Sequence, residues 1–209
     1  MKLFDLDGTL IDSTGVWREV DYQFLSNHKL KPTEEYMANI VRFTFPVAAQ
    51  YTKEYYHLDL DPNSIIAEWT SLVYDAYAHQ IPLKPGALEY LTKEAANGET
   101  LVLVTSCAPE LGHAVLKRHG LSSLFHKLLF AQELGLEKND PKFFEHILDV
   151  LNISASDCTF YDDSPDNCAT AKKTGMTVIG VYDSCYAARK NEILASCDQY
   201  ISSFRELID

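Results

Sequence analysis

The sequence has no long hydrophobic run and few positive charges. No stretch approaches the roughly 20 apolar residues of a membrane-spanning helix, and the start, with Lys2 and a short apolar run, does not resemble a secretory signal. There are 18 lysines and arginines against 30 aspartates and glutamates, which gives a net charge of −12. Nucleic acids and anionic membranes need a positive patch, so the composition argues against both as partners. We expect a cytoplasmic protein.

The cysteines form no Cys-X-X-Cys pair and are odd in number, at Cys107, Cys158, Cys168, Cys185 and Cys197. Neither a zinc site nor a complete disulfide framework is indicated, and reduced, partly buried thiols are expected. None of the seven histidines has metal-ligand spacing either. A metal site in this chain would therefore use oxygen ligands.

The pattern of apolar residues differs between two parts of the chain. Residues 14–82 predict four helices, each of the last three opened by proline or Asp-Pro, whereas residues 83–209 alternate short apolar strands with helices. Strands are expected at about 1–5, 100–105, 127–131, 158–163 and 177–182, with a possible edge strand at "QYIS". Such alternation predicts an α/β fold with a doubly wound, mainly parallel sheet. The predicted domains are therefore 1–13 with 83–209, and an α-helical insertion at 14–82.

The residues that end these strands are unusually polar. In open parallel sheets, ligands bind beyond the carboxyl ends of the strands. Asp5 and Asp7 follow the first strand, Thr105 and Ser106 follow the second, and an acidic pair ends the fourth. We expect the sheet to bring these side chains to one rim together with a lysine. The acidic pair is Asp162 and Asp163, and the lysine is Lys138.

Several carboxylates sharing one small site repel one another unless a cation neutralises them. Oxygen ligands without histidine or cysteine favour Mg²⁺, which completes its shell with waters and phosphate oxygens. The opening "FDLDGTL" then suggests a division of labour, since residues two apart in an extended chain point to the same side. Asp5 would attack phosphorus, and Asp7 would protonate the leaving alcohol and then activate water.

These motifs together resemble the haloacid-dehalogenase-like hydrolase superfamily. The resemblance rests on "FDLDGTL", Thr105 in "LVLVTS", Lys138 in "KNDP" and the acids of "YDDSPDNCATAKKTGM", and the helical insertion resembles the cap of the β-phosphoglucomutase-like branch. It implies a Rossmann-like core with Asp5 as nucleophile and metal ligand, and Asp7 as general acid/base that also gives a backbone carbonyl to Mg²⁺. It also implies that Thr105 and Lys138 bind phosphate and that Asp163, with Asp162, binds the metal. We expect Ser106, which follows Thr105 at the same strand end, to bind phosphate as well.

The resemblance also narrows the reaction. The family's dehalogenases lack the second aspartate of the first motif, and its phosphonatases carry a small residue there, so Asp7 favours phosphate esters. By the same resemblance, the mutases of this branch carry a histidine ten residues after the general acid, at the position where this chain has Trp17. We therefore expect a Mg²⁺-dependent phosphatase acting on a small phosphorylated metabolite, such as a sugar phosphate. Phosphoglucomutase-type transfer and a non-catalytic phosphate-binding or phosphoacceptor module remain as alternatives.

Several positions stay open at this point. The third motif commonly reads Lys-Pro but here reads Lys138-Asn139, which leaves Lys142 as an alternative lysine. Asp166 belongs either to the site or to the first turn of a helix, where an acid is favourable. Arg42 lies in the insertion and either reaches a substrate or stays at the surface. Hinges are expected near "DSTG" and "QIPLKPG"; neither the particular substrate nor the oligomeric state is predicted.

Overall fold

A computed structural model describes residues 1–40 and 45–208 of the chain. It contains two compact units: residues 1–14 with 81–209, called the sheet unit below, and residues 15–80, called the helical unit. The predicted insertion at 14–82 differs from the helical unit by one residue at its start and two at its end. Across the described ranges, no helix combines the length and apolar character needed to cross a bilayer.

The sheet unit is built on six parallel strands in the order β3-β2-β1-β4-β5-β6. Their bounds are β1 Lys2–Phe4, β2 Leu101–Thr105, β3 Lys127–Phe130, β4 Thr159–Asp162, β5 Thr177–Val181 and β6 Gln199–Ile201. The chain leaves β1 toward one edge and returns to its other side at β4, so the strand order reverses between these two strands. The prediction of an α/β fold with a doubly wound sheet is confirmed.

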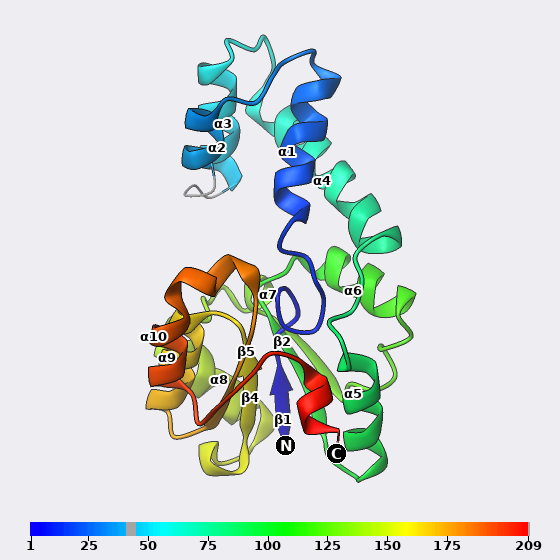
Figure 1. Cartoon of the computed structure of the whole chain (residues 1–209), viewed down its shortest axis with the longest axis vertical. Helices are drawn as coiled ribbons and strands as arrows, with labels where there is room; N and C mark the ends of the chain where they lie inside the picture. Colours follow the sequence, from blue (N-terminus) through cyan, green and yellow to red (C-terminus); the bar gives the residue numbers. More distant parts are fainter. Residues whose placement is uncertain (41–44, 209) are drawn as a thin grey trace. The chain divides into compact units, whose positions relative to one another are not determined.

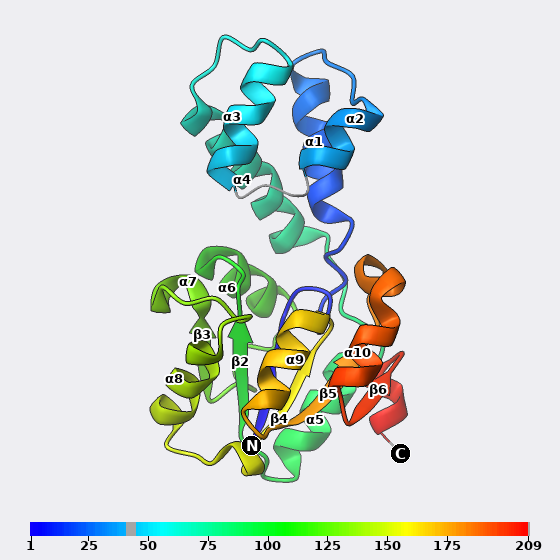
Figure 2. The ribbon, with the colours of Figure 1, turned by 90° about the vertical axis from the view of Figure 1, so that its left-hand side faces the viewer.

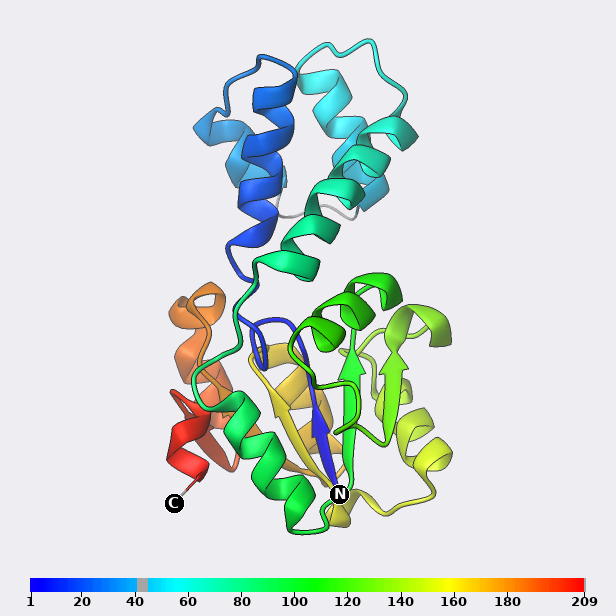
Figure 3. The same cartoon turned by 90° about the vertical axis from the view of Figure 1, so that its right-hand side faces the viewer.

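Helices cover both faces of the sheet. Figures 2 and 3 show α8, α9 and α10 over one face and α5 and α6 over the other. Their bounds are α5 Ala87–Ala96, α6 Pro109–Arg118, α7 Ala131–Leu134, α8 Pro141–Leu151, α9 Pro165–Lys173 and α10 Lys190–Ser196. Burial on both faces explains why β2 reads "LVLVT" without polar alternation, since all five of its residues are buried. Short 3-10 turns lie at Ala155–Asp157, Ser184–Arg189 and Phe204–Leu207.

The helical unit consists of α1 Val16–Asn27, α2 Glu34–Ile40, α3 Phe45–Tyr55 and α4 Pro62–His79, which Figure 1 shows in blue to green-cyan. Helix α4 contacts α1 and α3, and α2 contacts α3. The start of α4 is fixed by the Asp61 side chain, which accepts a hydrogen bond from the Asn63 amide, and by a proline in the first turn. Phe24 of α1 packs edge-to-face on Trp69 of α4, with ring centroids 5.6 Å apart. This aromatic contact therefore joins the first and last helices of the unit.

Candidate active site

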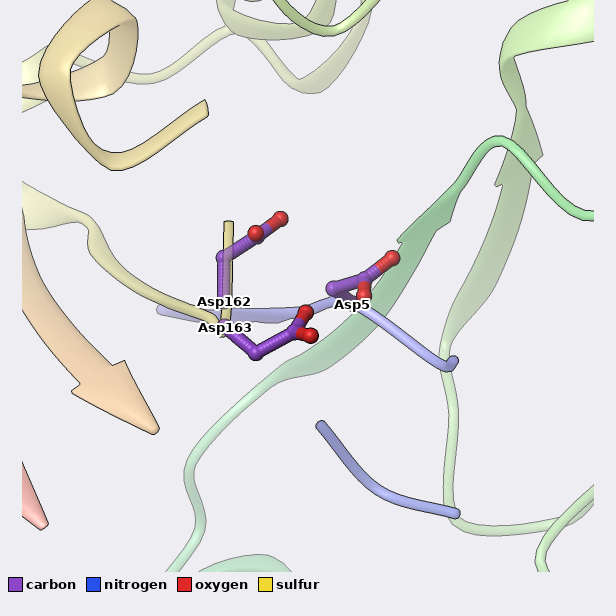
Figure 4. A group of neighbouring side chains, drawn as sticks. All are labelled: Asp5, Asp162 and Asp163. Carbon is purple, nitrogen blue, oxygen red and sulfur yellow. The ribbon is translucent and has the colours of Figure 1, made fainter. Parts of the chain in front are cut away.

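The site lies where β1 and β4 end, at the reversal of strand order. Asp5 follows β1, and its amide donates to the Tyr161 carbonyl at 2.9 Å, which extends the pairing of β1 with β4. Asp162 is the last residue of β4, and Asp163 follows it. Figure 4 shows the three carboxylates gathered at these strand ends. An oxygen from each lies within 4.8 Å of the others, and all three residues are buried.

Lys138 lies inside this group of acids. Its Nζ contacts Asp5 Oδ1 at 2.5 Å and Asp162 Oδ2 at 2.7 Å, with the Val104 carbonyl oxygen of β2 at 3.5 Å. The lysine side chain is 3% exposed, so these contacts replace water almost completely. Lys138 therefore ties the end of β1 to the end of β4.

The loop before α8 holds Lys138 in place. Asp140 caps α8, since its side chain accepts from the Lys142 amide at 3.0 Å, and Pro141 occupies the first turn. The Thr170 hydroxyl of α9 donates to the Asn139 carbonyl at 3.2 Å. The helix cap and this bond from α9 together fix the backbone on the C-terminal side of Lys138.

Asp162 and Asp163 have different surroundings. Asp162 accepts bonds from the Ser164 amide at 2.8 Å and from the Asn167 side chain at 3.2 Å, in addition to its contact with Lys138. Asp163 Oδ1 accepts a bond from the Thr9 hydroxyl at 3.3 Å. Structural support is thus concentrated on Asp162, which leaves Asp163 the better placed of the pair to bind a ligand.

The glycine of "DGT" is required by this geometry. Gly8 has a φ of +77°, and a Cβ atom added there would lie 2.2 Å from Asp163 Oδ2. A side chain at this position would therefore strain the backbone and displace the carboxylate. The turn after Asp7 fits closely against Asp163.

The electrostatics of the cluster favour a cation. Burial raises the pKa of Asp5 to about 7, with Lys138 opposing the shift and Asp162 adding to it. Burial, then the neighbouring acids, also raise the pKa of Asp163 well above its usual value. Burial alone would lower the pKa of Lys138, but the charges of Asp162 and Asp5 outweigh it and raise that pKa. The three buried carboxylates thus exceed the charge that Lys138 can neutralise.

The remaining predicted site residues differ in exposure. Asp7 is half-buried, and its backbone bridges to Ile11; its carboxylate is not part of the three-acid cluster. Thr105 is fully buried at the end of β2, where its hydroxyl accepts a bond from the Cys107 amide at 3.0 Å. Ser106 is exposed.

The positions left open by the sequence are placed as follows. Lys142 is exposed on α8, whereas Lys138 lies among the acids. Asp166 is exposed on α9 and makes a two-bond ion pair with Arg189, each bond 2.9 Å long. Arg42 lies outside the described residues.

Sequence reasoning did not select three polar residues near these acids: Thr9, Asn167 and Asp183. Thr9 belongs to the same "DGT" as Asp7, and Asn167 lies in the first turn of α9, so their places in the motifs were available signals. Asp183 lies just beyond β5, and this position at a strand end is a signal of the same kind as those of Asp5 and Asp163. Its partners come from distant segments, which no local pattern reveals.

The fold and the site agree with one protein family. The sequence profile of the family described as "Haloacid dehalogenase-like hydrolase" matches residues 2–181. The chain belongs to this family. Within it, the chain is a phosphoric monoester hydrolase. The predicted superfamily is thereby confirmed, and the likeness to the β-phosphoglucomutase-like branch is one of fold.

Two named phosphatases and one solved structure are similar to the chain. The chain is 27% identical over 191 residues to a phosphoglycolate phosphatase of Rhodospirillum rubrum, covering 85% of this chain and 77% of that protein. It is 25% identical over 195 residues to hexitol phosphatase A of Escherichia coli, covering 91% and 87%. A crystal structure of a proposed β-phosphoglucomutase from Thermotoga maritima superposes with a TM-score of 0.85 at 19% identity, covering 99% and 95%. That structural likeness concerns the fold.

Proposed function

We propose that this protein is a Mg²⁺-dependent phosphatase that hydrolyses a small phosphorylated metabolite, a sugar phosphate, through an aspartyl-phosphate intermediate on Asp5. The observation that carries the proposal is the buried cluster of Asp5, Asp162 and Asp163 around Lys138 at the reversal of strand order. The names of the phosphoglycolate and hexitol phosphatases support the substrate class. A cytoplasmic location belongs to this proposal, since such metabolites are found there.

The residues of the site fit a magnesium ion. The cluster offers oxygen donors alone, and among the described residues Lys138 is the ammonium that contacts them. Asp5, Asp163 and, with less freedom, Asp162 would hold the ion together with the backbone carbonyl of Asp7. The bound ion would supply positive charge that keeps these carboxylates ionised and attracts a phosphoryl oxygen.

In the first half of the proposed reaction, a carboxylate oxygen of Asp5 forms a bond to phosphorus and the bond to the leaving alcohol breaks. The carboxyl of Asp7 gives its proton to that alcohol. The Thr105 hydroxyl, Ser106, Lys138 and nearby backbone amides would hold the phosphoryl oxygens. Lys138 would also keep Asp5 oriented through Oδ1. An alkoxide leaves slowly without a proton, so Asp7 matters most for alkyl and sugar phosphates.

In the second half, the carboxylate of Asp7 takes a proton from a water molecule that attacks the aspartyl phosphate. Phosphate leaves, and the carboxylate of Asp5 is restored. In this proposal the helical insertion at 14–82 is a cap that excludes bulk water during the transfer and carries the residues that select the substrate.

The test is phosphate release from a panel of phosphorylated sugars, nucleotides and small acids, with and without Mg²⁺. Asp5→Asn removes the nucleophile, and Asp166→Asn is the matched control because it changes an exposed aspartate paired with Arg189. We expect phosphate release to need Mg²⁺. The rate of release should fall by about 1,000-fold in Asp5→Asn and should be unchanged in the control.

Two outcomes would contradict the proposal. Release that persists in Asp5→Asn would exclude the aspartyl phosphate. A folded protein that binds Mg²⁺ but releases no phosphate from any compound would exclude phosphatase action; testing sugar phosphates for isomerisation would then examine the mutase alternative.

A further inference from the structure

A further buried carboxylate, Asp183, lies outside the three-acid cluster. It follows β5, and its side chain is fully buried. Asp183 Oδ1 accepts a bond from the Thr14 hydroxyl at 2.6 Å and one from the Cys185 amide at 2.8 Å, while Oδ2 contacts Lys84 Nζ at 2.6 Å. Both oxygens of a side chain without solvent contact are thus engaged.

These contacts keep Asp183 charged. Burial opposes ionisation, but the bonds from Lys84, Thr14 and the Cys185 amide prevail and hold the pKa of Asp183 below its usual value. A buried ion pair of this kind is costly to break, because removal of one partner leaves the other charge without compensation. The cost makes Asp183 a rigid point in the sheet unit.

Two of the partners belong to the two segments that join the sheet unit to the helical unit. Thr14 ends the first of these segments, and Lys84 lies near the start of the second, which begins at Ile81. The segments also pair with each other: the Asp12 amide donates to the Pro82 carbonyl, and the Lys84 amide donates to the Leu10 carbonyl, both at 2.9 Å. We call this pair of segments, residues 10–14 and 81–84, the linker ribbon. Asp183 bonds both segments of the linker ribbon, through Thr14 and Lys84.

The linker ribbon continues into the backbone of Asp7. Ile11 bridges to Leu83 on one side and to Asp7 on the other. The Gly8 amide also donates to the Ile11 carbonyl at 3.0 Å. Asp7 is therefore supported by Ile11, Ile11 by the ribbon, and the ribbon by Asp183.

We propose that Asp183 is a positioning residue for Asp7, which it serves by anchoring the linker ribbon against which the Asp7 turn is built. The inference rests on the proposed function, since it assigns Asp183 to the proton-transfer step of that reaction. Asp183 itself touches neither phosphate nor metal in this scheme. Its loss should leave the attack by Asp5 intact and weaken the proton transfer by Asp7.

The test compares kcat/KM for an alkyl phosphate, the best substrate of the panel, with kcat/KM for 4-nitrophenyl phosphate. The value of kcat/KM covers the steps through departure of the leaving group, and nitrophenolate leaves without a proton. For Asp183→Asn we expect about a tenfold loss on the alkyl phosphate and less than about a threefold loss on the aryl phosphate. A general loss of structure would lower both values equally.

Asp12→Asn is the matched control. Asp12 lies on the same ribbon and faces the same Lys84 ammonium at 3.6 Å, but its side chain is 57% exposed. We expect this variant to keep both kcat/KM values. Where Asp183→Asn fails to fold, Thr14→Val removes one bond to the same carboxylate, and we expect about a threefold loss confined to the alkyl phosphate.

Equal losses on the two substrates, or none in a folded Asp183→Asn protein, would overturn the positioning role. Amide hydrogen exchange separates this failure from a failure of the proposed function, because it needs no turnover. Exchange at Asp12 and Lys84 should accelerate in Asp183→Asn and not in Asp12→Asn. An inactive wild-type protein would refute the reaction and with it the role of Asp183 in proton transfer; unchanged exchange would refute the anchor itself.

Discussion

The two units of the chain bury different kinds of side chain. In the helical unit, the buried side chains among the described residues are apolar or aromatic, apart from Thr52, whose hydroxyl pairs with Tyr36. The sheet unit has an apolar core as well, but it also buries charged groups, namely Asp5, Glu94, Lys138, Asp162, Asp163 and Asp183. Among the described residues, fully buried charge is therefore confined to the sheet unit, whereas the helical unit has the half-buried Asp21.

This difference separates what stabilises the protein from what it does. A buried apolar side chain contributes through the area it removes from water, about 25 cal/mol per Å². A buried carboxylate costs free energy unless partners or a cation compensate it, so such groups persist where chemistry needs them. The sheet unit should consequently respond to Mg²⁺ and to changes of its buried charges, whereas the helical unit should respond mainly to packing and, at Asp21, to pH.

The largest effect is expected for Lys138→Met. It leaves three buried carboxylates without their ammonium, and we expect the free energy of unfolding without Mg²⁺ to fall by about 3–5 kcal/mol and phosphate release to disappear. Added Mg²⁺ should recover part of the stability, because it replaces the missing charge. Urea unfolding with and without Mg²⁺ measures both. Lys142→Met, on the exposed face of α8, should stay within about 0.5 kcal/mol of the wild type; equal behaviour of the two variants would contradict the role of Lys138.

Gly8→Ala tests the close fit of the turn against Asp163. The added methyl would displace the carboxylate, and we expect kcat/KM to fall by about 100-fold and Mg²⁺ to bind more weakly. Gly98→Ala is the control, since Gly98 has a similar φ of +84° but no atom within 4 Å of the added Cβ. Both variants carry backbone strain of about 1–2 kcal/mol. A comparable loss of activity in both would show that strain, and not the contact with Asp163, is responsible.

A pH-dependent effect is expected for Asp21→Asn in the helical unit. Burial raises the pKa of Asp21 to about 7, so the folded state binds its proton more tightly than the unfolded state does. The stability of the wild type should fall as the pH rises from about 4 to 7 and then level off. The variant lacks this loss and should be more stable at pH 8 by about 1–2 kcal/mol, a figure reduced because the carboxyl is partly exposed.

Thermal unfolding of this variant and the wild type at pH 4 and pH 8 measures the effect. The two proteins should differ least at pH 4. A difference that does not grow toward pH 8 would exclude a raised pKa at Asp21.

The smallest effect is expected for Tyr36→Phe, which removes a hydroxyl buried in the helical unit. Its partner, the Thr52 hydroxyl 2.9 Å away, also donates to the Ala48 carbonyl and so keeps a bond. We expect the free energy of unfolding to fall by about 1 kcal/mol, with the Mg²⁺ response unchanged. Urea titration checks the first point and Mg²⁺ titration the second; an altered Mg²⁺ response would break the contrast between the units.

The sequence predicts the strands well for a physical reason. The inner strands β1, β2, β4 and β5 are short, largely buried runs bounded by polar or turn residues, and burial on both faces removes the ambiguity of a half-polar pattern. The predicted strands end within about one residue of the observed ones, for example at Phe130 for β3 and Val181 for β5. The four-residue helix α7 and the 3-10 turns escape prediction, because they are too short to show a period.

Some residues of the candidate site are likewise predictable from the strands, and others are not. Asp5 and Asp163 directly follow strands and Thr105 ends one, so the fold alone indicates where they lie. Lys138 comes from a loop, and its choice over Lys142 depends on Asp140, which caps α8 and places Lys142 inside the helix. Asp183 also lies just beyond a strand, so its place is predictable, but its role is not, because its partners Thr14 and Lys84 are set by the tertiary structure.

The central place of β1 in the sheet also has a consequence for the order in which the protein folds. Lys2 pairs with Leu101 on one side and with Thr159 on the other, whereas the helical unit is closed by residues 15–80 alone. During synthesis the helices can therefore pack before either neighbour of β1 exists. The proposed nucleophile, Asp5, precedes the helical unit in the chain, yet its surroundings are completed only when Asp163 has emerged. A ribosome stalled between these points would carry a folded helical unit on a chain that still has no active site.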